Sequence, residues 1–233
     1  MKPKTWVQRA NVAIEGIIYA VKTQRHMRYH FGSALAALVL GLLLNISRTE
    51  FILLCMAIIL VIVTEMLNTA IETTVDMISV EFHPLAKIAK DIAAGVVLVA
   101  SIGALILAYL ILYPPLRTAI VTGQWHSRQS PGDVIAFAAL AVVIILVIII
   151  KAYFGKGEPL HGGMPSGHAA VAFSVWTASV YLTGSFPIML LTLLLAAMVS
   201  WSRWSSGIHR PIEVMSGALL GAGVTFLFFW LFT

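Results

Sequence analysis

The sequence predicts an all-α integral membrane protein, in which an N-terminal amphipathic surface helix precedes about seven transmembrane helices. Two observations lead to this fold class. Of the 233 residues, 60% are hydrophobic and only 11% are charged, a balance that soluble globular domains do not show. Apolar runs of roughly 20 residues, the length that crosses a bilayer core as a helix, also recur along the whole chain.

The N-terminal segment, residues 6–21, has apolar residues at helical spacing, with Arg9 and Asn11 between them. This pattern is typical of a helix that lies on the membrane surface, with its apolar face in the lipid. A water-soluble packing helix is the alternative interpretation.

The apolar runs that follow predict the membrane spans. We expect them at about 31–46, 51–77, 92–113, 134–151, 169–201 and 212–232. The fifth run is too long for one crossing, and Gly184 with Pro187 divides it, which gives seven spans.

The segment 113–133 is the only long polar break with proline and glycine, so we interpret it as a domain boundary. The predicted domains are residues 1–116 and 133–233, joined by a linker at 117–132.

The basic residues are distributed unevenly between the two sides of this seven-span topology. One side has only Arg48, Arg117 and Arg128, whereas the other has Lys2, Lys4, Arg9, Lys22, Arg25, Arg28, Lys87, Lys90, Lys151, Lys156, Arg203 and Arg210. The positive-inside rule places the basic side in the cytoplasm. A nucleic-acid-binding patch is the competing interpretation, but these charges sit in short loops between spans, so we expect no nucleic-acid partner.

The second span ends in a polar stripe. At 100° per residue, Glu65, Asn68, Glu72 and Asp76 fall within about 80° of one another on a helix. Ionised carboxylates in lipid are costly, so such residues usually face a bundle interior and are functional. A helix end that emerges among headgroups is the alternative, which explains Asp76 but hardly Glu65.

Carboxylates this close together favour a divalent cation between them, because like charges share a site poorly. A hard ion such as Mg²⁺ prefers oxygen ligands and brings phosphate with it. Lys90 and Asp91 open the third span from the same side, and a lysine there can pair with phosphate. Metal-binding acids, a carboxylate base and a lysine together indicate phosphoryl transfer from a nucleotide.

The pattern E-x-x-N-T-A-I-E at 65–72, followed by Asp76 and by Ala-Lys-Asp at 89–91, resembles the signature of the prokaryotic diacylglycerol kinase and undecaprenol kinase family. The resemblance covers about residues 5–113, with three spans. It implies that Glu65 deprotonates the lipid hydroxyl and that Glu72 binds the metal. Asn68, Lys90 and Asp91 would serve ATP or its phosphates. It also implies a homotrimer with composite sites and a bacterial inner membrane.

One position departs from that family. A second metal-binding Glu usually stands in a T-E-R-N-x-R-x-H-like segment before the first span, where this chain has TQRHMRYH at 23–30. Gln24 can ligate a metal only through its neutral oxygen. Kinase activity would then be weaker, or the metal preference changed.

Two stretches in the second half indicate different chemistry. KGEPLHGGMPSGHAAVAF at 156–173 and SRWSSGIHRPIEV at 202–214 are predicted at one membrane face. Arginine and lysine can hold phosphate oxygens, while one histidine attacks phosphorus and another protonates the leaving oxygen. Glu213, four residues after His209, would fix the tautomer of that ring. The alternative interpretation is that these histidines have only a structural role at the membrane boundary.

These stretches resemble the type 2 phosphatidic acid phosphatase superfamily, whose pattern is K-x6-R-P, P-S-G-H and S-R-x5-H-x3-D. The second block is complete at 165–168, and the third matches except that Glu213 replaces Asp. The resemblance implies that His209 is the nucleophile and His168 the general acid. The phosphate would be held by Arg203, Ser166 and the Gly167 amide, without a metal.

The first block of that pattern is damaged. Lys151 has the right spacing to Glu158-Pro159, but Glu stands where the superfamily has Arg. Lys156 is an alternative phosphate ligand. The resemblance covers about residues 133–233, with four spans where the superfamily typically has six.

A kinase and a phosphatase in one chain, both facing the cytoplasm, would waste ATP if they shared one lipid monophosphate. They converge if polyprenol is phosphorylated and polyprenyl diphosphate is hydrolysed, because both reactions give polyprenyl (undecaprenyl) phosphate. The alternative pairs a diacylglycerol kinase with a phosphatidate or phosphatidylglycerol-phosphate phosphatase. An ion-coupled transporter or lipid-binding scaffold is the non-enzymatic alternative.

Overall fold

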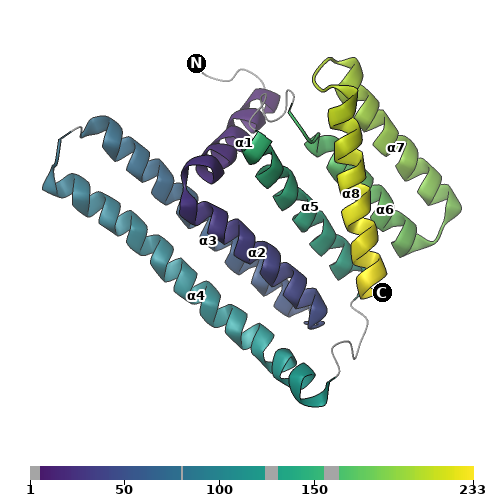
Figure 1. Cartoon of the computed structure of the whole chain (residues 1–233), viewed down its shortest axis with the longest axis horizontal. Helices are drawn as coiled ribbons and strands as arrows, with labels where there is room; N and C mark the ends of the chain where they lie inside the picture. Colours follow the sequence, from purple (N-terminus) through teal and green to yellow (C-terminus); the bar gives the residue numbers. More distant parts are fainter. Residues whose placement is uncertain (1–5, 80, 124–130, 155–162) are drawn as a thin grey trace. The chain divides into compact units, whose positions relative to one another are not determined.

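The computed structural model describes residues 6–79, 81–123, 131–154 and 163–233. Within these ranges the chain forms eight helices and no strand (Figure 1). The helices are α1 (Trp6–Thr23), α2 (Arg25–Leu43), α3 (Arg48–Ile78), α4 (Pro84–Thr122), α5 (Gly132–Phe154), α6 (Gly167–Thr183), α7 (Phe186–Ser205) and α8 (Pro211–Phe232). The predicted all-α class is confirmed.

Five helices, α3, α4, α5, α7 and α8, are long and apolar enough to cross a membrane. The other two predicted spans form helices that miss this standard. Helix α6 has only 17 residues, and α2 has two arginines and two histidines in its first turns. Many large apolar side chains point outward, such as Val99 and Leu219, each 72% exposed, as helices in contact with lipid require.

The helices group into two compact units. One comprises residues 23–128, with α2, α3 and α4, and the other comprises α5–α8 together with residues 1–22. Helix α1 therefore groups with the C-terminal helices, although the predicted N-terminal domain, residues 1–116, includes it. Its position on a membrane surface stays a prediction.

In the first unit, α3 and α4 pack side by side along their length (Figure 1). Helix α3 begins at a capping box, where Ser47 Oγ accepts from the Glu50 amide at 3.3 Å and Glu50 accepts from the Ser47 amide at 2.7 Å. Helix α4 begins at Pro84, after His83 caps its first turn. The His83 cap therefore begins α4 directly after the turn that brings the polar stripe of α3 close to the lysines of α4.

Helix α4 continues past the predicted end of its span. It runs through Pro114 and Pro115 and ends at Thr122, before Gly123 at φ 68°. The predicted linker at 117–132 therefore begins inside a helix. Prolines are tolerated in membrane helices, and α4 keeps its helical backbone on both sides of this pair. One turn later, Thr118 Oγ1 donates to the Pro114 carbonyl at 3.0 Å.

In the second unit, α6 packs against α5, α7 and α8. The closest approach joins α6 to α8, where Gly217 faces the backbone of Ser166 and Gly221 faces that of Ala170. One turn further, Ser174 Oγ and Thr225 Oγ1 form a buried hydrogen bond of 2.7 Å. Small residues four apart on both helices allow this close contact, as in other membrane helix pairs.

We predict that Gly221→Ala destabilises the second unit. A Cβ at Gly221 would lie 1.9 Å from the Ala170 carbonyl oxygen, so the two backbones would have to move apart. Overpacking of this kind costs about 1–3 kcal/mol. The midpoint of thermal unfolding in detergent should fall.

Gly223→Ala is the matched control, because a Cβ there meets nothing within 4 Å. Its midpoint should stay level or rise slightly, since alanine favours the helix. Equal midpoints for the two variants would contradict the close packing of α6 on α8.

Candidate active sites

The polar stripe of α3 faces two environments. Glu65 is 3% exposed and Asn68 is buried, whereas Asp76 lies at the exposed end of the helix. Asn68 Nδ2 donates to Glu72 Oε1 at 3.1 Å. Its Oδ1 is buried and accepts no hydrogen bond from any described residue. A buried carbonyl oxygen beside a carboxylate is a donor set that suits a hard cation.

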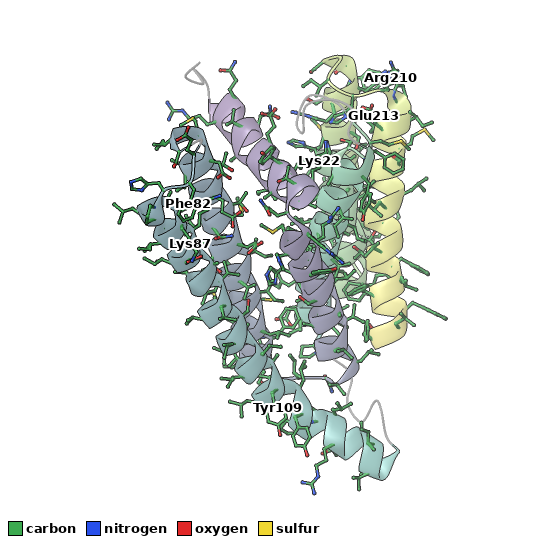
Figure 2. The ribbon with its side chains drawn as sticks, turned by 60° about the vertical axis from the view of Figure 1, so that its left-hand side comes forward. Lys22, Phe82, Lys87, Tyr109, Arg210 and Glu213 are labelled. Carbon is green, nitrogen blue, oxygen red and sulfur yellow. The ribbon has the colours of Figure 1, made fainter. Side chains whose placement is uncertain are left out.

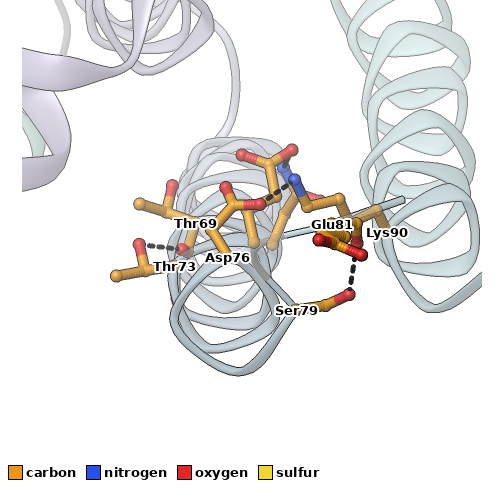
Figure 3. A network of polar contacts seen from close by, with 8 residues as sticks. Thr69, Thr73, Asp76, Ser79, Glu81 and Lys90 are labelled. Atoms are coloured by element: carbon orange, nitrogen blue, oxygen red, sulfur yellow. Dashed lines mark hydrogen bonds and ion pairs between the residues drawn. The ribbon is translucent and has the colours of Figure 1, made fainter. Parts of the chain in front are cut away.

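The turn between α3 and α4 forms a polar cleft of about 310 Å³. Lys90 Nζ from α4 lies 2.5 Å from Asp76 Oδ1 of α3, and Ser79 Oγ donates to the Glu81 carbonyl at 2.8 Å (Figure 3). Lys87 and Asp91 pair within α4 at 2.7 Å. Both ion pairs are partly exposed, so solvent screens them and each is worth little to stability.

The cleft contains both basic and acidic side chains, which suits a polyanionic ligand that binds together with a metal ion. Lys87, Lys90 and His83 line it together with Asp76, Glu81 and Asp91. Phe82 and Lys87 lie at the start of α4, beside this turn (Figure 2). The predicted residues Asp76, Lys90 and Asp91 therefore gather here, while Glu65 lies three turns further along α3.

The predicted metal ligands come from different helices. Glu72 lies on α3, and Gln24 is the residue before α2, where its side chain makes no capping bond. Among the described residues no group of three or more His, Cys, Asp or Glu side chains could hold a metal. The unpartnered Asn68 oxygen and the Glu72 carboxylate are the groups that fit a metal ion.

An apolar cavity of about 230 Å³ lies within the same unit, between α2, α3 and α4. Small residues such as Ala37, Ala57 and Ala104 line it, and His30 lies at its border. His30 is within electrostatic range of Glu65. An apolar cavity near a buried carboxylate suits a lipid with a hydroxyl head.

The second site is built around His209. Its Nδ1 lies 2.9 Å from Glu213 Oε2, and that oxygen also accepts from the Arg210 amide at 3.1 Å. Arg210 and Glu213 lie at the start of α8 (Figure 2). With Nδ1–H donated to the carboxylate, Nε2 has the free lone pair and can act as a nucleophile.

The P-S-G-H segment is attached to the same turn of α8. The Ser166 amide donates to the Glu213 carbonyl at 2.8 Å, and the His209 amide donates to the Arg203 carbonyl at 3.1 Å. Backbone bonds therefore bring Ser166, Arg203 and His209 together around Glu213.

Three polar atoms in this cluster are buried without a hydrogen-bond partner among the described residues: Ser166 Oγ, Arg203 Nε and His209 Nε2. Buried polar groups are nearly always paired, so three orphans at one place indicate a missing ligand. Lys151, 8% exposed, and Arg203 both act electrostatically on His168 and on His209. Two hydrogen-bond donors among positive charges fit an anion such as phosphate.

All the predicted phosphatase residues that the structure describes converge here: Lys151, Ser166, Gly167, His168, Arg203, His209 and Glu213. Lys156, and the Glu158-Pro159 pair of the damaged block, lie outside the described residues. Sequence reasoning missed Gly217 and Gly221. Their spacing of four, followed by Thr225, was the available signal. It also missed Lys87, Glu81 and His83 in the first cleft.

Comparison with known proteins finds two families. The sequence model of the prokaryotic diacylglycerol kinase family matches residues 11–112, and that of the PAP2 superfamily matches residues 150–233. A diacylglycerol kinase of Synechocystis is 41% identical over 107 residues, which cover 46% of this chain and 61% of that protein. The chain thus spans less than two thirds of this relative.

An undecaprenol kinase of Bacillus subtilis is 42% identical over 101 residues, which cover 43% of this chain and 82% of that protein. An undecaprenyl-diphosphatase of Sulfolobus acidocaldarius is 35% identical over 75 residues, 32% of this chain and 36% of that protein. No solved structure matches significantly.

The environment of His209 predicts its titration. Burial lowers the pKa of His209 below its ordinary value, and Lys151 and Arg203 add to the shift, whereas the hydrogen bond and charge of Glu213 oppose it. A histidine is neutral above its pKa, so the ring stays neutral to lower pH than usual. In ring-labelled protein, the NMR midpoint of His209 should lie below 6.5.

Glu213→Gln should move that midpoint further down, because it removes a group that raises the pKa. Glu50→Gln, in the other unit, should leave it unchanged. A midpoint that rises in Glu213→Gln would contradict the 2.9 Å contact between the two side chains.

Proposed function

Because the chain belongs to the prokaryotic diacylglycerol kinase family over residues 11–112 and has a PAP2 superfamily domain at 150–233, we propose that it is a bifunctional membrane enzyme. One half phosphorylates a lipid alcohol with ATP, and the other hydrolyses a lipid phosphate or diphosphate. The observation that carries the proposal is the His209–Glu213 pair beside two buried, unpartnered donors, Ser166 Oγ and Arg203 Nε, because it combines a nucleophile with an anion site.

In the kinase half, Glu65 accepts the proton of the lipid hydroxyl. The alcohol oxygen forms the new bond to the γ-phosphorus of ATP while the bond from that phosphorus to the bridging oxygen breaks and ADP leaves. The apolar cavity of α2, α3 and α4 gives the lipid tail a place near this carboxylate. Lys90 pairs with phosphate oxygens in exchange for Asp76, and Asp91 with Asn68 supports the nucleotide. Glu72 and Gln24 would hold Mg²⁺, and the unpartnered Asn68 oxygen beside Glu72 fits the same ion, which would supply neutralising charge on the phosphates.

In the phosphatase half, His209 Nε2 attacks phosphorus while the bond from phosphorus to the leaving oxygen breaks. His168 gives that oxygen a proton, and Glu213 holds the positive ring of His209. Arg203, Ser166, the Gly167 amide and Lys151 hold the phosphate oxygens. Water then releases phosphate from the histidine. By resemblance no metal takes part, so EDTA should leave this activity intact.

We propose polyprenyl monophosphate as the common product. Two relatives support this choice by name, an undecaprenol kinase for the first half and an undecaprenyl-diphosphatase for the second. Both halves would then act on the cytoplasmic face of a bacterial inner membrane, as the distribution of basic residues favours. By resemblance to the kinase family, the assembly is a homotrimer.

Relatives named diacylglycerol kinase favour the second candidate, in which the phosphatase acts on phosphatidate or phosphatidylglycerol phosphate.

A lipid panel on the purified full chain tests the proposal. Polyprenol with ATP–Mg²⁺, and polyprenyl diphosphate without ATP, should both yield polyprenyl monophosphate. Diacylglycerol and phosphatidate are the comparison substrates. Turnover of diacylglycerol and phosphatidate alone would favour the second candidate function. If no lipid is phosphorylated or dephosphorylated, the enzymatic proposal fails and a transporter or lipid-binding scaffold is the remaining interpretation.

Glu65→Gln should abolish ATP-dependent phosphorylation and leave phosphatase turnover nearly intact. A general base contributes about 10²–10⁴-fold, so initial rates of both reactions decide the question. Glu50→Gln, in the capping box at the other end of the same helix, is the control. Loss of both activities in Glu65→Gln would show that the two sites are not separate.

Gln24→Glu should raise kinase turnover or lower the Mg²⁺ concentration needed for half-maximal rate, because a charged ligand replaces a neutral one. A Mg²⁺ titration of kinase rate measures this. Unchanged Mg²⁺ dependence would place Gln24 away from the metal.

A further inference from the structure

Helix α7 contains a polar atom that neither sequence motif accounts for. Ser200 Oγ is buried and has no hydrogen-bond partner among the described residues. Hydroxyls inside helices usually bond back to a carbonyl one turn earlier. Thr192 on the same helix does so, to Ile188 at 2.7 Å, and Thr177 on α6 does so at 3.0 Å. Ser200 therefore has a donor available for something else.

Ser200 faces the interior of the α6–α7 hairpin. It follows Ala196 by four residues and precedes Arg203 by three, so these three share one helix face. Ala196 is 2% exposed. Further back on this face, Thr192 contacts Ser179 of α6 at 2.9 Å. The hydroxyl thus lies on the face that also presents Arg203.

The register of the α6–α7 hairpin shows which residues of α6 lie at the same height along the helix axis as Ser200. Helices α6 and α7 are antiparallel, and both rise by the same distance per residue. Eight residues on from Thr192 is Ser200, and eight back from its partner Ser179 is Val171. Ser200 is therefore level with Val171, which lies within one helical turn of His168 on α6.

We propose that Ser200 is a further substrate-binding residue of the phosphatase site, whose hydroxyl donates a hydrogen bond to the leaving group of a lipid diphosphate. This inference rests on the proposed phosphatase function and specifies its substrate class. His168 serves the leaving oxygen, so a hydroxyl within one helical turn of His168, on the face of α7 that also has Arg203, is placed to reach the other oxygens of the leaving group.

The chemistry separates the two substrate classes. When His209 attacks the terminal phosphorus of a diphosphate, the bridging P–O bond breaks and its electron pair goes to a departing phosphate monoester. That group has further oxygens, which can accept from Ser200 while His168 serves the bridging oxygen. A lipid monophosphate leaves as an alkoxide with one oxygen, which His168 already serves. Ser200 thus has an acceptor only on a diphosphate.

The first test compares Ser200→Ala with wild type on polyprenyl diphosphate and on phosphatidate. We expect kcat/KM to fall about tenfold or more for the diphosphate, the usual loss for a hydrogen bond to a charged group, and less than about twofold for the monophosphate. Ser200→Thr, which keeps the hydroxyl, should retain more diphosphate activity than Ser200→Ala. Ser205→Ala, at an exposed serine of the same helix, is the control. An equal loss on both substrates, or none on the diphosphate, would overturn the proposal.

The second test needs no turnover. Inorganic pyrophosphate and orthophosphate are each added to the full chain in detergent, and thermal unfolding is followed. Pyrophosphate should stabilise wild type more than Ser200→Ala, whereas orthophosphate should stabilise both equally. Equal stabilisation by pyrophosphate would refute the role of Ser200. If wild type hydrolyses no diphosphate while pyrophosphate still distinguishes the variants, the proposed reaction fails and the binding role stands.

Discussion

The backbone contact between α6 and α8 is the constraint on which the second site depends. Gly217 lets the Ser166 carbonyl approach α8, and the Ser166 amide bonds to the Glu213 carbonyl one turn away. Glu213 also holds His209. The segment that presents Ser166 and His168 is therefore attached to the turn that orients the nucleophile. A side chain at Gly217 would separate the two histidines without touching either, so packing and chemistry are inseparable here.

The first site is built on a different principle. Its contacts are mostly local, such as Asn68 with Glu72 four residues on and Lys87 with Asp91 four residues on. One ion pair, Asp76 with Lys90, joins α3 to α4. Such a site follows from helical spacing and one turn, and it stays open, with its ion pairs partly exposed. The second site needs four helices together, α5 to α8, so it is enclosed and leaves donors without partners.

This difference explains what the sequence could predict. The stripe of Glu65, Asn68 and Glu72 follows from 3.6-residue periodicity, and the pairing of His209 with Glu213 follows from a spacing of four. Neither rule shows that α4 continues through Pro114 and Pro115, because proline usually ends a helix and its tolerance in a membrane helix depends on the surroundings. The role of Gly221 and the level of Ser200 depend on which helices pack together and in what register, and one-dimensional patterns do not contain that information.

The chemistry of the leaving group links both halves of the molecule. A site that cuts a monophosphate must protonate an alkoxide, so it depends strongly on its general acid. A site that cuts a diphosphate releases a phosphate, a much better leaving group, and can instead use additional donors to hold it. In our proposal, the unpartnered Ser200 hydroxyl makes this a site of the second kind. A phosphatase of that kind does not reverse the neighbouring kinase, because its product is the monophosphate that the kinase also makes. Under the proposed function, joining the two activities in one chain supplies one lipid phosphate from two precursors without wasting ATP.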